Sequence, residues 1–331
     1  MQHRFLSRVP VWVWRTLMAT IGRGETRRFN TDPIDTVDYH LDVDYLGDGL
    51  RAHRLDVIVP RPSGDHLPVY IYFHGGGWTS GDKSTLTKYC ASQAREGMVV
   101  VNVNYRMATE FRMRHILQDA NAAIDWVAAN ISAFGGDPDR VVLGGDSAGG
   151  QIVALLAASR HNTELAQHYE LGTPAAPWTL RGLVQHCSIA DISVLFEPRF
   201  ILSLNFIRML LPAPLLRQTR PVSQRASERT LSLRAAARFL SPIDWLGPEF
   251  PPVFVSTSER DYFFRANVNF IRALRRMNIL VDTLIFSRRS TRATHTWQQD
   301  PRRPESQEVY RRLQEFVRRV TAPALAATSA Q

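Results

Sequence analysis

Cysteine is scarce in this chain, which has only Cys90 and Cys187 among its 331 residues. The two lie in separate apolar segments, so we expect two buried thiols and no disulfide framework. No group of cysteines and histidines has the spacing of a zinc site either. The sequence therefore predicts no bound metal, and no pattern in it indicates a cofactor.

Long hydrophobic runs are also lacking. The apolar segment from Val9 to Gly22 is too short to span a bilayer, and Arg15 interrupts it. It makes a poor signal peptide, because no clean small-residue cleavage site follows an uninterrupted apolar core. Two interpretations of residues 1–35 stay open: part of a helical cap, or a basic amphipathic helix that contacts a membrane surface. We expect a cytoplasmic protein, peripheral to a membrane in the second case.

Acidic residues are outnumbered, because 40 Lys and Arg face 31 Asp and Glu, for a formal net charge of +9. Such an excess can indicate nucleic-acid binding. However, the sequence has no nucleic-acid-binding motif, and its arginines are dispersed rather than gathered in one basic tract. We therefore predict no nucleic-acid partner. Contact with anionic lipid, or a generally basic proteome, accounts for the charge equally well.

Two glycine-rich motifs carry the chemistry that the sequence predicts. His74-Gly75-Gly76-Gly77-Trp78 fits the HGGG loop, whose backbone amides form an oxyanion hole. Gly145-Asp146-Ser147-Ala148-Gly149-Gly150 fits the G-x-S-x-G elbow, in which a serine stands on a sharp strand-to-helix turn. Each motif directly follows an apolar, strand-like run. Their order and context predict acyl-transfer chemistry, with Ser147 as the nucleophile.

A serine hydroxyl is a weak nucleophile, so it needs a base that a carboxylate orients. In this topology the acid and then the base should follow the serine along the chain. His295 is the only histidine beyond the last predicted strand, and it lies in a loop. Asp261 comes just after the predicted strand 253–258, where the acid belongs, and Glu259 is its nearest rival. The other histidines after Ser147 lie in a polar stretch or inside a strand: His161, His168 and His186.

Strand-like and helical segments alternate along the chain, which predicts a mostly parallel sheet with helices on both faces. An antiparallel hairpin is expected first, around Gly47-Asp48-Gly49. The next strands and helices are expected at residues 67–73, 83–96, 98–104, 114–133, 140–143, 151–158, 183–189, 253–258, 264–277, 281–287 and 305–320.

Residues 196–240 break this alternation with eight arginines and several prolines among apolar helical stretches. We expect a helical cap there or, as the alternative, a solvated basic loop. The expected division is an N-terminal cap or membrane-contacting helix (1–35), a first core part (36–195), the cap insertion (196–240), a second core part (241–320) and a frayed tail (321–331).

With these motifs the chain resembles the hormone-sensitive-lipase family of α/β-hydrolases, from about Leu67 to the loop at His295. Further matching segments are Asn104-Tyr105-Arg106-Met107-Ala108, Phe134-Gly135-Gly136-Asp137-Pro138 and Leu240-Ser241-Pro242. The resemblance implies an α/β-hydrolase fold and the hydrolysis of small-molecule or lipid esters. The sequence departs from the family at Thr109, Gln151 and Thr296-Trp297, where proline, asparagine and a small residue followed by phenylalanine are usual.

The resemblance also implies a role for each site residue. Ser147 is then the nucleophile, Asp261 the orienting acid and His295 the base. The backbone donors to the oxyanion are expected from Gly75, Gly76 and Ala148, and the rest of the first motif, His74, Gly77 and Trp78, is expected beside the substrate. Two other interpretations stay open: amide hydrolysis or acyl transfer by the same triad, and a non-catalytic binding module on the same fold.

Overall fold

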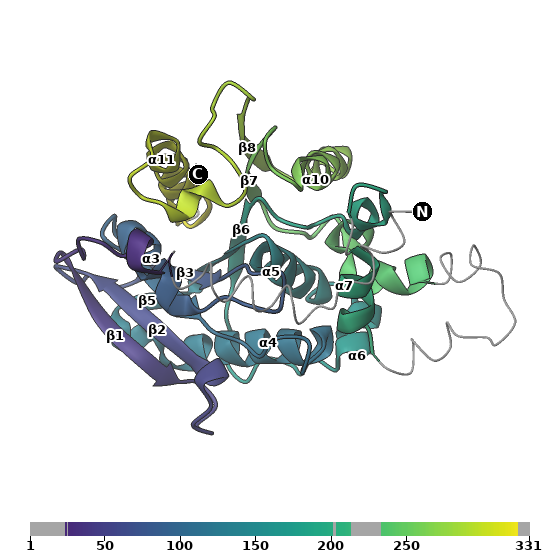
Figure 1. The fold of residues 1–331 in the computed structure, drawn as a ribbon. Helices are drawn as coiled ribbons and strands as arrows, with labels where there is room; N and C mark the ends of the chain where they lie inside the picture. The colour runs from purple at the N-terminus through teal and green to yellow at the C-terminus, as the bar shows by residue number, and fades with distance from the viewer. Residues whose placement is uncertain (1–23, 25, 201–202, 213–232, 324–331) are drawn as a thin grey trace, which may run out of the picture.

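One eight-stranded sheet organises the molecule in the computed structural model, which describes residues 24, 26–200, 203–212 and 233–323. Its strand order is β1-β2-β4-β3-β5-β6-β7-β8 (Figure 1). Strand β2 pairs antiparallel with both β1 and β4, and all other neighbours are parallel. The strands are β1 (Val37–Asp44), β2 (Arg54–Pro60), β3 (Leu67–Phe73), β4 (Val99–Val103), β5 (Gly136–Asp146), β6 (Leu180–His186), β7 (Val253–Ser258) and β8 (Val281–Phe286). The predicted hairpin and mostly parallel sheet are confirmed.

Helices cover both faces of this sheet, as predicted. The helices α4 (Met113–Asn130), α5 (Ala148–Ser159) and α10 (Phe264–Arg276) share one hydrophobic cluster, while α3 (Thr87–Ala94) and α11 (Pro304–Val320) share a second. Side chains of a strand alternate between the two clusters, because successive residues point to opposite faces. In β3, for example, Ile71 and Phe73 face the first cluster and Tyr70 and Tyr72 the second.

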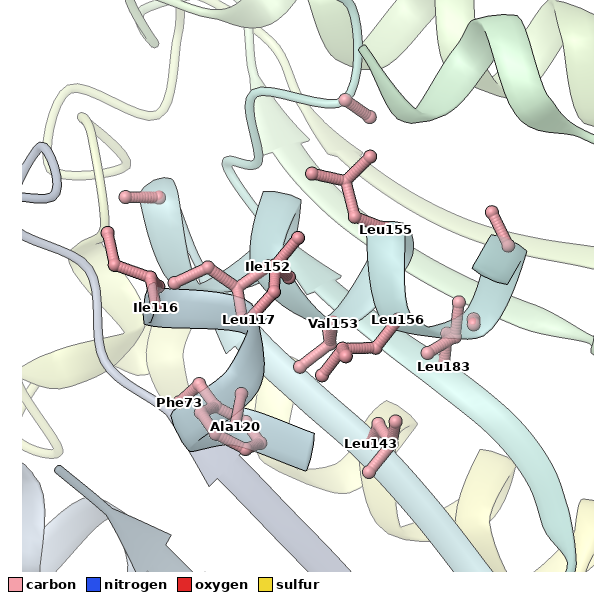
Figure 2. Packing of buried hydrophobic residues seen from close by; sticks show 14 of the residues in the cluster. Phe73, Ile116, Leu117, Ala120, Leu143, Ile152, Val153, Leu155, Leu156 and Leu183 are labelled. Atoms are coloured by element: carbon pink, nitrogen blue, oxygen red, sulfur yellow. The ribbon is translucent and has the colours of Figure 1, made fainter. Parts of the chain in front are cut away.

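The helix α5 lies at the centre of the first cluster. Its residues from Ala148 to Ala158 are all buried, so it is apolar around its whole circumference. Figure 2 shows its Ile152 and Val153 between the side chains of α4 and those of the sheet. Shortening a buried leucine such as Leu155 to alanine typically costs about 2–5 kcal/mol. The core therefore holds rigidly the helix that begins at Ser147.

Helix boundaries differ from the prediction in two places. The helix predicted over 83–96 begins as the short turn η2 (Lys83–Leu86) and continues as α3. The helix α6 (Thr163–Tyr169) was not predicted, because its segment is short and polar. The side chain of Asn162 caps α6, because its oxygen accepts a hydrogen bond from the Leu165 N–H at 2.9 Å. Asparagine is a preferred N-cap residue, so this start of a helix was visible in the sequence.

The remaining turns connect these elements. They are η1 (Arg51–His53), η3 (Ile131–Phe134), η4 (Ile192–Phe196), η5 (Arg238–Leu240), η6 (Pro242–Trp245) and η7 (Trp297–Gln299). Gly135 follows η3 at φ 76°, the left-handed conformation that ends a helix. Cys90 and Cys187 are both buried free thiols, which confirms that prediction.

The predicted cap insertion is only partly described. Its helix α7 (Ser203–Leu210) packs on the core, and its Ile207 and Leu210 are buried in the first hydrophobic cluster. Arg112 donates to the carbonyls at the C-terminal end of α7, the closest being that of Leu211 at 2.7 Å, and the ring of Phe206 lies 6.0 Å from that of Trp78. Residues 201–202 and 213–232 lie outside the described residues.

The chain ends are described from residue 24 and to residue 323, so the predictions for 1–23 and 324–331 lie outside the described residues. Asn30 docks near α3 by donating to the Ser84 carbonyl at 2.6 Å and accepting the Lys88 N–H at 3.0 Å. Within the expected tail, Thr321 is buried and its N–H donates to the Val317 carbonyl at 3.0 Å, and the boundary of the tail stays a prediction. Among the described helices, none combines the length and apolar character that crossing a membrane requires.

Candidate active site

The nucleophile elbow forms where β5 passes into α5. Ser147 has φ 49° and ψ −114°, a strained conformation for a residue with a side chain. A Cβ atom on Gly149 would collide with the carbonyl oxygen of Phe73, so only glycine lets α5 start this close to β3. The Ser147 N–H donates to the His186 carbonyl at 2.9 Å, which continues the β5–β6 pairing into the turn.

The structure brings the three predicted catalytic side chains together. His295 Nδ1 lies 2.6 Å from Asp261 Oδ1, and His295 Nε2 lies 3.1 Å from Ser147 Oγ. Because an ionised carboxylate only accepts hydrogen bonds, Nδ1 carries the proton and Nε2 is free to accept one from the serine hydroxyl. The Asp261 side chain is fully buried, whereas that of His295 is 21% exposed. The imidazole of His295 is therefore reachable from outside, and the carboxylate of Asp261 is not.

The carboxylate of Asp261 is held by further partners. Thr257 Oγ1 donates to Oδ2 at 3.2 Å, and the Phe263 N–H donates to Oδ1 at 3.2 Å. Its rival Glu259 is exposed and accepts the Arg288 N–H instead, at 2.9 Å. The geometry therefore favours Asp261 as the partner of His295.

Cys187 lies beside this pair, in a left-handed conformation just past β6. Burial raises the pKa of its thiol well above the ordinary value. Its sulfur and the ligand atoms of Asp261 and His295 lie within 4.8 Å of one another, the one group among the described residues that could geometrically hold a metal ion. Asp261 and His295 are already held together by their direct hydrogen bond, so their closeness needs no metal ion to explain it.

The glycine loop after β3, residues 75–77, differs from the prediction in one expected oxyanion donor, the backbone N–H of Gly75. The Gly75 N–H donates to Asp146 Oδ1 at 3.0 Å, so this amide is already engaged and cannot serve an oxyanion in this geometry. Within the described part of the chain, the backbone N–H groups of Gly76, Gly77 and Ala148 have no acceptor. Both Gly76 and Gly77 have positive φ, 117° and 60°, which turns their amides away from the β-strand direction.

Asp146 connects three segments of the site, a role that the sequence did not predict. Its buried carboxylate accepts from Tyr72 Oη at 2.6 Å, from the Gly75 N–H at 3.0 Å and from Gln299 Nε2 at 2.9 Å. Burial raises the pKa of this carboxyl, and the hydrogen bonds oppose that shift. Asp146 thereby ties the elbow to the oxyanion loop and to the loop that carries His295.

His74 and Trp78, expected beside the substrate, are both 2% exposed. The His74 ring stacks on Tyr105 with centroids 4.6 Å apart, and Tyr105 Oη donates to the His74 carbonyl at 2.7 Å. Trp78 Nε1 donates to Gln151 Oε1 at 2.7 Å, and Gln151 in turn donates to the Leu240 carbonyl. These buried side chains support the glycine loop, and Gln151 links it to Leu240, the last residue of the predicted cap insertion.

A second polar cluster lies under the site, on the opposite face of the sheet. His186 is fully buried, with Nε2 2.9 Å from Tyr89 Oη and Nδ1 2.6 Å from Ser256 Oγ. Burial lowers the pKa of His186 to about 3, so the ring is neutral at physiological pH. Neither ring nitrogen is left for chemistry at Ser147.

A family model and several curated proteins match parts of this chain. A family model described as "alpha/beta hydrolase fold" matches residues 70–289. Carboxylesterase NlhH of Mycobacterium tuberculosis is 36% identical over 176 residues, which cover 53% of this chain and 52% of NlhH. Carboxylic ester hydrolase LipN of the same species is 36% identical over 145 residues, 43% of this chain and 38% of LipN. The matched part of the chain thus spans about half the length of NlhH and less of LipN.

Solved structures share the fold at low sequence identity. Esterase B from Lactobacillus rhamnosis superposes with a TM-score of 0.80 at 19% identity, covering 97% of this chain and 96% of that one. An esterase from Pyrobaculum calidifontis gives a TM-score of 0.68 at 20% identity, covering 97% and 98%. The predicted α/β-hydrolase fold is thereby confirmed.

Proposed function

We propose that this chain, which belongs to the hormone-sensitive-lipase-like family of α/β-hydrolases, hydrolyses carboxylic esters through an acyl-enzyme on Ser147. The observation that carries the proposal is the continuous hydrogen-bonded chain from Asp261 through His295 to Ser147, at 2.6 Å and 3.1 Å. A strained serine at a strand-to-helix turn, a histidine within hydrogen-bond reach of its hydroxyl and a buried carboxylate that orients the histidine are the parts that nucleophilic acyl transfer needs.

In the first half of the reaction His295 Nε2 takes the proton of Ser147 as Oγ bonds to the ester carbonyl carbon. The carbonyl π electrons move to oxygen, which becomes an oxyanion. His295 then gives the proton to the alcohol oxygen as the carbon–oxygen bond breaks. In the second half a water molecule attacks the acyl-serine by the same proton route. Asp261 holds the imidazole in the required tautomer and stabilises the imidazolium that forms.

The oxyanion hole is proposed from three free amides, those of Gly76, Gly77 and Ala148. They replace the expected set with Gly75, because the Gly75 N–H is engaged with Asp146 at 3.0 Å. One oxyanion donor is typically worth about 3 kcal/mol of transition-state stabilisation. Gly75 acts in this proposal as the anchor that fixes the position of the two glycines after it.

Residues 196–240 are proposed to cap this site and to shape the acyl pocket. What supports the proposal is the contact of α7 with the oxyanion loop, where Phe206 and Trp78 lie 6.0 Å apart, ring to ring. The substrates would then be short- to medium-chain acyl esters or lipids whose acyl group fits beneath the cap. The hypothesis that residues 1–35 contact a membrane stays a prediction, because only residues 24 and 26–35 of that segment are described.

The test is a series of p-nitrophenyl esters of increasing acyl length, together with labelling by a fluorophosphonate probe. Wild type should turn over part of the series and be labelled on Ser147, and Ser147→Ala should lose both. Ser159→Ala, at the other end of α5, is the matched control and should keep both. Labelling of another serine, or unchanged turnover in Ser147→Ala, would refute the assignment.

A further inference from the structure

Aromatic rings from two segments surround the proposed base. The ring of Tyr262 lies 5.4 Å from that of His295 at an interplanar angle of 47°, and Phe263 lies 5.4 Å from it at 69°. Phe200 stacks on Phe263, with centroids 5.6 Å apart and planes 2° from parallel. These three residues form an aromatic wall beside His295.

Tyr262 is the exposed member of this aromatic wall. It is 69% exposed, the highest value among the large hydrophobic side chains described, whereas Phe263 is half-buried. Its backbone is held on both sides, because the Asp261 N–H donates to the Ser258 carbonyl at 2.9 Å and the Phe264 N–H to the Asp261 carbonyl at 3.2 Å. A ring that is mostly exposed beside the His295 imidazole contributes little to the hydrophobic core and is open to contact with a substrate.

Ion pairs hold the other side of the aromatic wall in place. Glu197 Oε1 lies 2.9 Å from Arg265 of α10, and its Oε2 lies 3.0 Å from Arg199. The pair with Arg265 joins the segment that carries Phe200 to the first turn of α10, next to Phe263, and the pair with Arg199 lies within that segment. The rings therefore stand on braced backbone rather than on an open loop.

The reaction itself decides which part of an ester meets this wall. His295 Nε2 must hand its proton to the oxygen of the departing alcohol, so that oxygen comes within hydrogen-bond reach of Nε2. The alcohol's carbon chain starts one bond further out, so it lies close to the imidazole ring, which the rings of Tyr262 and Phe263 approach to 5.4 Å. The acyl group is bonded to Ser147 instead, and it stays on the other side of the carbonyl carbon.

We propose that Tyr262 and Phe263 line the leaving-group subsite and that Tyr262 selects esters of aromatic alcohols. The proposal rests on the ester hydrolysis proposed above. An arylmethyl group could pack against the exposed Tyr262 ring in an edge or offset geometry, worth about tenfold in kcat/KM. A plain alkyl alcohol of two carbons cannot reach far enough to gain this contact.

The test compares benzyl acetate with ethyl acetate, which share the acyl group and release alcohols of similar basicity. Tyr262→Ala should lower kcat/KM for benzyl acetate about tenfold and leave ethyl acetate within about twofold. Tyr262→Phe should keep the wild-type preference, because the ring remains. Leu280→Ala is the surface control, since Leu280 is 55% exposed at the start of β8, away from Ser147. The ratio of ethyl butyrate to ethyl acetate reports on the acyl side and should not change.

Four results would overturn the proposal. An equal fall for both acetates in Tyr262→Ala would mean that the ring only supports His295. A changed butyrate-to-acetate ratio would place the rings on the acyl side. If wild type hydrolyses none of these esters and the fluorophosphonate probe does not label Ser147, the proposed function fails, and the subsite fails with it. Labelling of Ser147 with no benzyl preference in wild type overturns the subsite alone.

Discussion

His186 should make this fold sensitive to mild acid, although it takes no part in the proposed chemistry. The ring is buried in β6, between the Tyr89 hydroxyl at 2.9 Å and the Ser256 hydroxyl at 2.6 Å. Protonation would place an imidazolium among groups with no negative charge. The informative perturbation is His186→Gln, which keeps a polar side chain in the cluster but cannot be protonated.

The size of the effect follows from the shift of the histidine pKa. Burial lowers the pKa of His186 from 6.5 to about 3 in the folded protein. Because the folded value lies below the unfolded one, the stabilisation by neutral His186 is complete above pH 6.5 and is lost as pH falls towards 3. Of the interval from pH 7 to pH 5, about 1.5 pH units lie below the unfolded pKa of 6.5. The free energy of unfolding should therefore fall by about 2 kcal/mol over this interval.

The assay is the free energy of unfolding from urea titrations at pH 7 and pH 5, for wild type and His186→Gln. The wild type should lose about 2 kcal/mol more than the variant between the two values. The variant can be less stable than wild type at pH 7 without affecting the test, because the quantity compared is the change in unfolding free energy between pH 7 and pH 5 within each protein. Burial also lowers the pKa of His74, but that residue titrates in both proteins and cancels. Equal losses in the two proteins would refute the reasoning.

Three further predictions concern the site and its supports. Asp261→Asn should cut kcat by about 10⁴-fold through the wrong histidine tautomer, while Glu259→Gln keeps activity; the reverse pattern would identify Glu259 as the acid. Asp146→Ala leaves three donors without an acceptor, at about 1–3 kcal/mol each, and should lower the urea midpoint far more than Asp146→Asn; equal midpoints would contradict this. Arg112→Ala should speed proteolysis within 196–240 without changing the midpoint of global unfolding, because it frees the end of α7; unchanged cleavage would show that α7 needs no such anchor.

The parts that the sequence predicted well depend on local chemistry. Gly145 and Gly149 permit the elbow through their missing side chains, a requirement that is written in the motif itself. The segment 253–258 forms β7, and the residue expected to follow it as the acid, Asp261, lies 2.6 Å from His295. That placement was predictable because the C-terminal ends of parallel strands meet at one edge of the sheet.

The parts that the sequence did not predict depend on contacts between distant segments. A glycine loop alone does not reveal which of its amides are free, since that depends on where the Asp146 carboxylate points. The role of Gln299 left no signal, because a glutamine in a loop is ordinary surface composition. The aromatic wall at Tyr262 was equally hidden, since its meaning comes from the distance of 5.4 Å to the His295 ring.

The hydrogen bonds of Asp146 show how contacts between distant segments fix the geometry of the site. Burying a carboxylate is costly unless hydrogen bonds replace its water. Here three donors do so, and they come from β3, from the oxyanion loop and from the loop after His295. Because each donor belongs to a different segment, the charge is satisfied only when all three segments take their places together. The position of the proposed oxyanion amides is thereby coupled to the position of the proposed base, which is the geometric condition that the proposed acyl transfer at Ser147 requires.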